Sequence, residues 1–390
     1  MNIFLILVTT FLIQFIIYLE MNFINPLIPY ISSIFNINES SVIYLNIGFS
    51  IVGLLVPLLG IWADKYSKKR ILIFSMFSFL LGTILCAIAK FPLIFAIGRT
   101  FIGLGNFTLN ASVISYISDF VPYSKRGKAS GFIRIAFALA ILLSPIYGTI
   151  MSKFSGLKII YFPLSLLSFI IIILCFMLPE TNGNNSAEIQ SANIEDFQSM
   201  IKNPITLKFL AIEFLIVSSP ILTLNYFSIW LKRTFSLNQS EIGVMYTFTA
   251  LGTVFGVLLY TAISHKLSDV LYSKISFIIM TVSLIFIPYM GSPYTVIPLS
   301  FLFAMGLDGG WTAFQTICSE VYPNNRTTFM TLIFFTNSLT FIIFTSLGPT
   351  LFEIGGYRLV MGIASLECLI SLFIFRNVFN DPTVRKRLKI

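Results

Sequence analysis

The sequence GIWADKYSKKR, residues 60–70, interrupts a stretch of chain that is almost free of charge. Only Glu20 and Glu39 are charged among the residues before it, whereas one acid and four bases lie within it. Apolar runs flank it on both sides, at 41–63 and 71–89. A short polar connection between two apolar runs of about 20 residues is typical of a loop between membrane-spanning helices.

The composition of the whole chain favours the same interpretation. Its 390 residues are 56% apolar and only 11% charged, whereas an average soluble domain is about 25% charged. In a bilayer every backbone polar group must be bonded within the protein, which leaves helices or closed barrels. Barrel strands alternate over about 10 residues, and the runs here are continuous and longer. The expected fold class is an all-α integral membrane protein.

The apolar pattern predicts twelve transmembrane helices. Several exceed the roughly 20 residues needed to span a bilayer, so tilt or bending is expected. The segments are 3–33, 41–63, 71–89, 92–119, 128–152, 157–178, 205–232, 240–264, 271–290, 293–321, 327–352 and 356–376.

The two halves of the chain resemble each other. FNINESSV at 35–42 is similar to FSLNQSEI at 235–242, and SDFVPYSKR at 118–126 is similar to SEVYPNNR at 319–326. We therefore expect two pseudo-symmetric bundles of six helices each, a plan known from transporters with a site at the midplane. The expected domains are a first bundle at 1–179, a cytoplasmic linker at 180–204, a second bundle at 205–376 and a basic cytoplasmic tail at 377–390.

The distribution of basic residues predicts the orientation. If both termini are cytoplasmic, seventeen of the 25 Lys and Arg residues lie in cytoplasmic segments and six in external ones. Cytoplasmic loops carry the excess of basic residues in membrane proteins. The sequence thus predicts a multi-pass protein of the plasma membrane with the 60–70 loop on the cytoplasmic side.

Several other classes of protein are disfavoured. The net charge of +9 could indicate nucleic-acid binding, but the bases lie between apolar segments and form no basic domain. The single histidine, His265, argues against a multi-histidine metal site, and the four cysteines fall inside apolar runs without metal-ligand spacing. No Walker-type phosphate loop and no nucleophile–base pair stands out. We expect no enzyme, no cofactor and no metal.

Motifs distributed along the chain resemble the major facilitator superfamily. The loop that opens this section is similar to the superfamily's Gly-x3-Asp-Arg/Lys-x-Gly-basic-basic motif, with Ser67 in place of the second glycine. Arg99, Gly103 and Gly105 match the pattern of its fourth helix. LPET at 178–181 is similar to its ending after helix six. This resemblance implies two six-helix bundles that transport a small organic solute, and SPIYG at 144–148 resembles the fifth helix of its exporters.

The resemblance also implies a cytoplasmic gate between helices. Asp64 ends its own helix, where the dipole disfavours an acid, so we expect a partner elsewhere: the start of the eleventh helix, or Arg126 in the facing loop. The gate residues expected are Gly60, Asp64, Lys65, Lys68, Lys69, Asp119 and Arg126.

Ionisable residues inside membrane segments are functional candidates, because burying a charge there is costly. The proton-coupling candidates are Asp308, Glu20, Arg99 and Glu213. Asp308 could load and release a proton, and Arg99 would favour the ionised form of a nearby acid. The alternative is a fixed Arg–carboxylate pair that only holds helices together. Glu20 lies about 160° around its helix from Asn22, on an apolar stripe. Either it faces the protein interior and stays protonated, or bending at Pro26 and Pro29 changes this geometry. For Glu367, in the last segment, a structural role is expected.

Polar side chains form stripes on four segments, and the resemblance implies that these four helices line a central cavity. Helical spacing places the members of each stripe on one face. The alternative is that the amides join helices by hydrogen bonds. The substrate-cavity candidates are Gln14, Tyr18, Asn22, Asn106, Asn110, Asn225, Tyr226, Trp311 and Gln315.

The function expected from the sequence is proton-coupled export of a small organic solute by alternating access. Its partners would be the solute, protons and the lipid bilayer, with no nucleic acid, and the protein would be a monomer. One alternative is a proton-coupled uptake symporter or a uniporter on the same fold. A more remote alternative is a membrane sensor that does not transport, which the short loops and tail disfavour.

Overall fold

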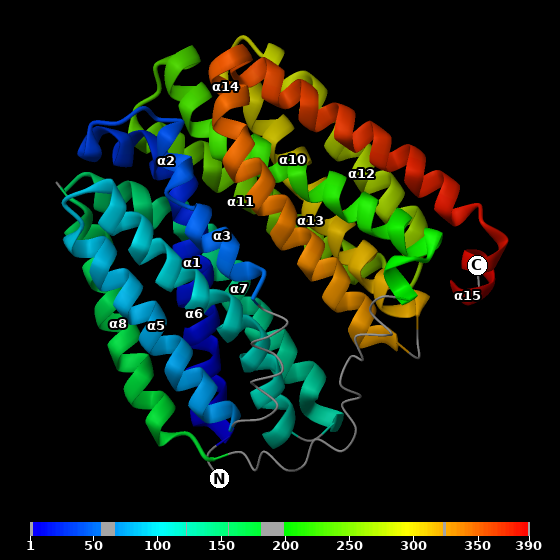
Figure 1. Ribbon diagram of the computed structural model, residues 1–390, viewed down its shortest axis with the longest axis horizontal. Helices are drawn as coiled ribbons and strands as arrows, with labels where there is room; N and C mark the ends of the chain where they lie inside the picture. Colours follow the sequence, from blue (N-terminus) through cyan, green and yellow to red (C-terminus); the bar gives the residue numbers. More distant parts are fainter. Residues whose placement is uncertain are drawn as a thin grey trace. The chain divides into compact units, whose positions relative to one another are not determined.

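The computed structural model describes residues 3–55, 67–121, 123–154, 156–180, 199–322 and 325–388. In these ranges the regular structure is helical (Figure 1). The chain divides into two compact units, Met1–Ser191 and Ala192–Ile390, and each is described by itself.

Unit 1 is a bundle in which the first helix packs against helices that come later in the chain. α1 contacts α7, α6 and α8, while α5 lies between α6 and α8. Pro92 starts α6 in the first turn, where its missing N–H leaves no extra unpaired donor. The helices of this unit are α1 (Ile3–Phe35), α2 (Ser41–Tyr44), α3 (Ile47–Gly53), α5 (Lys68–Ile88), α6 (Pro92–Phe120), α7 (Tyr123–Ser152) and α8 (Leu157–Met177).

Unit 2 is built in a similar way. α10 packs against α14, and α13 packs against both α11 and α12. Asn238 starts α11 with a capping box, in which its side chain accepts from the backbone of Glu241 and the Glu241 carboxylate accepts from the backbone of Asn238. Its elements are α10 (Pro204–Phe235), α11 (Gln239–Ile263), α12 (Asp269–Phe286), the 3-10 turn η1 (Ile287–Tyr289), α13 (Pro293–Val321), α14 (Arg326–Phe379) and α15 (Pro382–Leu388).

Ten helices in the described ranges are long and apolar enough to cross a membrane. Large apolar side chains are exposed on them, such as Phe74 at 60%, Leu258 at 62% and Phe373 at 67%, as a lipid-facing surface requires. The expectation of an all-helical membrane protein is confirmed, whereas the count of twelve spans stays a prediction.

Two of the expected segments need comment. α14 covers both 327–352 and 356–376, but Gly356 breaks it with φ 61° and ψ −162°. As one straight rod, α14 would be about 80 Å long, far more than the roughly 30 Å of a hydrocarbon core, so Gly356 divides it into two arms. The expected segment 41–63 begins with α2 and α3, and its end lies outside the described residues.

The expected tail at 377–390 contains helical residues. α14 runs to Phe379, and α15 follows after Asp381. The carboxylate of Asp381 accepts hydrogen bonds from the side chain and backbone of Thr383, and these bonds lower its pKa.

The sequence repeat has a structural counterpart in the backbone. Among the described residues, Asn36 (φ 52°) and Ser236 (φ 55°) are the two non-glycine residues with positive φ. They hold the same position in FNIN at 35–38 and FSLN at 235–238. Because positive φ is uncommon for residues other than glycine, its occurrence at matching positions shows that the repeated sequences form the same helix ending.

Close helix packing is repeated as well. A Cβ added at Gly105 of α6 would lie 2.8 Å from the carbonyl oxygen of Ser75 on α5. A Cβ added at Gly306 of α13 would lie 2.5 Å from that of Ser276 on α12. Ser276 comes 201 positions after Ser75, and Gly306 comes 201 positions after Gly105. Small residues let membrane helices approach closely, and here they do so at equivalent points of the two units.

These contacts yield a stability prediction. Gly105→Val and Gly306→Val should each lower the melting temperature of the purified protein in detergent, since overpacking costs about 1–3 kcal/mol. Gly131→Ala is the matched control, because nothing lies within 4 Å of its added Cβ. Equal melting temperatures for all three variants would contradict the packing account.

Candidate transport site

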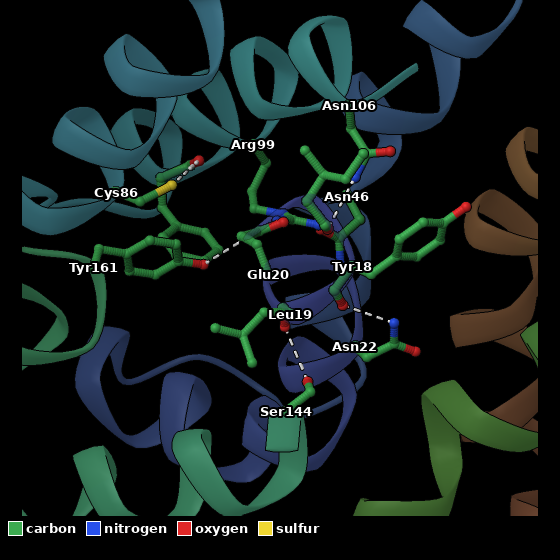
Figure 2. A network of polar contacts seen from close by, with 12 residues as sticks. Tyr18, Leu19, Glu20, Asn22, Asn46, Cys86, Arg99, Asn106, Ser144 and Tyr161 are labelled. Atoms are coloured by element: carbon green, nitrogen blue, oxygen red, sulfur yellow. Dashed lines mark hydrogen bonds and ion pairs between the residues drawn. The ribbon is translucent and has the colours of Figure 1, made fainter. Parts of the chain in front are cut away.

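A buried ion pair lies at the centre of unit 1. Glu20 of α1 and Arg99 of α6 are 0% and 3% exposed, and their side chains form a salt bridge (Figure 2). Glu20 shares its face of α1 with Ile13, Ile16, Ile17, Ile24 and Leu27, which are all buried. The carboxylate therefore faces the protein interior, and its cation comes from a neighbouring helix.

Three further side chains position this pair. Nε of Arg99 donates to Oδ1 of Asn46 at 2.7 Å, and its guanidinium lies 4.8 Å from the centre of the Phe49 ring. The hydroxyl of Tyr161 donates to Oε1 of Glu20 over 3.5 Å. These contacts hold Arg99 and one oxygen of Glu20 in one arrangement. Oε2 of Glu20 has no hydrogen-bond partner within the described residues.

The polar stripes of α1 and α6 meet beside the ion pair. Nδ2 of Asn106 donates to the backbone oxygen of Ile17 at 3.1 Å, and Nδ2 of Asn110 donates to Oδ1 of Asn106 at 3.3 Å. Asn106 thus joins α6 to α1, as the helix-joining interpretation expects, whereas Asn110 is only half-buried.

The remaining stripe residues of α1 differ in their exposure. Tyr18 and Asn22 are half-buried, and Nδ2 of Asn22 donates to the backbone oxygen of Tyr18 (Figure 2). Gln14 is 3% exposed, and its Oε1 has no hydrogen-bond partner within the described ranges. The half-buried residues are those that a solute could contact.

Unit 2 contains a buried carboxylate with a different environment. Glu213 of α10 is 0% exposed, and its Oε1 accepts hydrogen bonds from three neutral side chains. Nε1 of Trp311 donates at 3.1 Å, Nε2 of Gln315 at 3.5 Å and Nδ2 of Asn337 at 3.5 Å. Oε2 of Glu213 has no partner in the part of the chain that the structure describes. Its negative charge is therefore solvated on one oxygen only.

Cations are absent from this cluster as far as the structure describes it. Three ion pairs join described residues, Lys68–Asp119, Lys69–Glu180 and Glu20–Arg99, and none of these involves Glu213. Oε1 of Gln315 also lacks a partner there. The cluster formed by α10, α13 and α14 thus contains an acid without a cation, Glu213, and an acceptor without a donor, Oε1 of Gln315.

Asp308 of α13 lies in a third environment. Its Oδ2 accepts a hydrogen bond from Thr253 of α11 at 2.6 Å, and the side chain is half-buried. Among the described residues it forms no ion pair. It is one turn from Trp311 along α13, so Asp308 and the Glu213 cluster share a helix.

The two candidates in the second half of α10, Asn225 and Tyr226, have unequal exposure. Tyr226 is buried and stacks on Phe352 with ring centres 4.8 Å apart, and Asn225 is half-buried. Tyr226 therefore packs α10 against α14, whereas Asn225 is accessible enough to meet a solute.

The expected gate residues are placed in part. Lys68 and Asp119 form a salt bridge at 2.6 Å between α5 and α6. Lys69 lies 3.8 Å from Glu180, whose Oε2 also accepts from Ser67. Gly60, Asp64 and Lys65 lie outside the described residues, as does the side chain of Arg126.

Metal coordination has no candidate in the described ranges. No group of three or more His, Cys, Asp or Glu side chains there is arranged to hold an ion. The four cysteines are free and buried.

Comparison with known proteins agrees with this architecture. The model of the Major Facilitator Superfamily matches residues 10–229 and 216–389. This chain belongs to the Major Facilitator Superfamily. It is a secondary transporter of the membrane and not an enzyme.

Relatives of this transporter include drug-resistance proteins. It is 23% identical over 317 residues to Multidrug resistance protein 1 of Bacillus subtilis, covering 80% of each chain. It is 33% identical to the uncharacterized MFS-type transporter YwfA of the same organism, but the match spans 34% of this chain and 32% of that relative.

A solved structure shows the same fold. A bacterial homolog of the human lysosomal transporter Spinster, in an inward-facing and unoccupied conformation, superposes with a TM-score of 0.78. The sequences are 14% identical, and the match covers 98% of this transporter and 97% of that chain.

Several residues of these networks escaped the sequence analysis. Asn46 accepts a hydrogen bond from Arg99, Tyr161 donates one to Glu20, and Asn337 donates one to Glu213. Asn46 and Asn337 stand out as amides within apolar segments, which is a usable signal. Nothing in the local sequence distinguishes Tyr161 from other aromatic residues.

The buried pair of the transporter can be tested by comparison with its exposed pair. Arg99→Gln should destabilise the protein by about 3–5 kcal/mol, because it leaves the Glu20 carboxylate buried without a cation. The double variant Glu20→Gln/Arg99→Gln should lose less than Arg99→Gln alone. Lys68→Gln, which breaks a half-exposed pair, should cost no more than about 1 kcal/mol. Thermal unfolding in detergent measures this order, and equal losses for Arg99→Gln and Lys68→Gln would contradict it.

Proposed function

We propose that this transporter exports a small organic solute in exchange for protons, and that Glu213 carries the proton. The chain would lie in the plasma membrane as a monomer with both termini cytoplasmic. It would work by alternating access, in which two six-helix halves expose one site first to one side of the membrane and then to the other.

The environment of Glu213 is the observation that carries the proposal. Three N–H donors converge on Oε1, while Oε2 is buried without a partner. A charged carboxylate in an apolar interior is costly, and binding a proton removes that cost. Oε2 is the atom left for the proton, because the donors already occupy Oε1. Loss of the proton leaves a negative charge that a passing solute or a change of conformation can accommodate.

Glu20 is a weaker candidate for the proton carrier. The guanidinium of Arg99 neutralises it in place, and Asn46, Phe49 and Tyr161 hold the pair. We propose that this pair fixes α1 to α6 throughout the cycle. Arg99 thereby acts as a structural cation in unit 1.

Asp308 is the second candidate for a proton site. It has one hydrogen bond, from Thr253, and more access than Glu213. A half-buried acid on the same helix as Trp311 and Gln315 would serve as the entry point through which protons reach Glu213. Substrate contact would fall to the half-buried polar residues, with Trp311 offering an aromatic surface.

The export direction is supported by the relatives, whose names describe drug resistance. Export also agrees with the Pro145 and Gly148 of α7, which resemble the fifth helix of exporters. Uptake by a symporter remains the alternative that the experiment distinguishes.

The test is proton movement in everted membrane vesicles with an acidic lumen, reported by a quenched pH-sensitive dye. Addition of transported compounds from a panel that includes ethidium should release protons from the lumen and restore fluorescence. Glu213→Gln should abolish this release, and Asp308→Asn should slow it at least tenfold. Glu353→Gln, which replaces an exposed acid of α14, is the control and should behave like the wild type.

Two results would contradict the proposal. Normal proton release by Glu213→Gln would exclude Glu213 as the carrier. Release that requires an opposite gradient, with solute and proton moving in the same direction, would establish uptake instead of export.

A further inference from the structure

Glu367 is a membrane-embedded acid that the proposed transport cycle does not use. It lies in the second arm of α14, eleven residues after Gly356 and twelve before Phe379, and thus near the middle of that span. The side chain is half-buried, and its neighbours Leu366 and Ile370 are 57% and 42% exposed on the apolar surface. Glu367 therefore lies at the border between the lipid-facing surface and the packed interior.

The hydroxyl of Ser218 on α10 contacts two acceptors at once. Its Oγ lies 2.8 Å from the backbone oxygen of Leu215 and within hydrogen-bond distance of Oε2 of Glu367. A serine hydroxyl has one hydrogen to donate. Both contacts are hydrogen bonds only if Glu367 carries a proton and donates it to Ser218, while Ser218 donates to Leu215. An ionised Glu367 would instead take the hydrogen of Ser218, and Leu215 would lose that bond.

This contact lies beside Pro220, which is inside α10. Pro220 has no N–H, so the backbone oxygen of Ile216 lacks its usual helical donor. The hydroxyl of Ser219 donates to that oxygen at 2.9 Å, next to the Ser218–Leu215 bond. Hydroxyl groups that bond back to carbonyls of the preceding turn bend helices. Ser218 and Ser219 therefore lie where they would stabilise a bend of α10 at Pro220.

We infer that Glu367 and Ser218 form a proton-sensitive switch that sets the bend of α10 at Pro220. With the proton on Glu367, Ser218 donates to the backbone oxygen of Leu215, and the bent form of α10 is stabilised. When the proton leaves, Ser218 turns to the carboxylate and α10 straightens. Glu367 thus acts as a positioning residue through Ser218.

The switch has a role in transport that rests on the proposed function. Glu213 is two residues before Leu215 on α10. A change of bend at Leu215 would therefore move Glu213 relative to its donors on α13 and α14. Protonation of Glu367 would in this way set when Glu213 releases its proton.

Few other charged or titratable groups lie near Glu367 in the described part of the chain. Ser218 of α10 contacts Glu367 directly. Around this contact, Ser219 lies against Met280 of α12, and Cys368 lies against Ser219 and Thr281, none of which is charged. The titratable neighbour on α14 itself is the buried thiol of Cys368. No ion pair of the described residues includes Glu367.

The first experiment follows the proton itself, without any substrate. Infrared difference spectra of the purified transporter between low and high pH should contain the carbonyl band of a protonated carboxyl group that is missing in Glu367→Gln. A spectrum that Glu367→Gln leaves unchanged would overturn the proposal.

The second experiment follows the bend. Spin labels at Lys208→Cys and Thr234→Cys lie on exposed positions on either side of Pro220, and the four native cysteines are fully buried. The distance between the labels should be longer at high pH than at low pH. Glu367→Gln, whose amide donates to Ser218 as a protonated acid would, should keep the short distance at both pH values.

Serine variants separate the switch from simple packing. Ser218→Ala should lose the pH-dependent shift in distance while retaining the infrared band of Glu367. Ser219→Ala, a matched change that does not contact Glu367, should retain both. A pH-dependent shift that survives in Glu367→Gln or in Ser218→Ala would overturn the switch, and neither readout depends on whether Glu213 carries the transported proton.

Discussion

The absence of water inside a bilayer forces every carboxylate there to find a cation, a donor or a proton. This protein meets that constraint in different ways. Glu20 has a cation, Arg99, on the neighbouring helix. Glu213 has three neutral N–H donors on one oxygen and none on the other. Oε2 of each acid lacks a hydrogen-bond partner among the described residues, so the cation is what distinguishes them. Glu20 is neutralised by Arg99 and holds helices together, whereas Glu213 has no cation in the described ranges and leaves a place for a proton.

The two units share packing but not chemistry. Asn36 and Ser236 end equivalent helices with the same positive φ, and Gly105 and Gly306 bring equivalent helices into contact. At the same offsets, however, Glu20 corresponds to Pro220 and Arg99 to Ser300. The repeat therefore reproduces the scaffold, and the second unit lacks the ion pair of the first. A proline inside α10 takes the place of the fixed acid.

Sequence reasoning predicted the elements well, because their ends carry local signals. Pro92, Pro204 and Pro293 start helices in the structure near the expected positions. The family resemblance is confirmed by the match to the superfamily model. Of the two orientations left open for Glu20, the structure agrees with the one that faces the interior. Each of these features depends on neighbours along one helix.

The partners across helices were beyond such reasoning. Glu20 and Arg99 were both candidates, but 79 residues separate them and no spacing rule joins α1 to α6. Asn337 reaches Glu213 from 124 residues away.

The most direct test of our account is the number of protons released when a transported compound is added to purified transporter in weakly buffered solution. We predict about one proton per protein for the wild type and for Glu20→Gln/Arg99→Gln, and none for Glu213→Gln; undiminished release from Glu213→Gln would contradict the account.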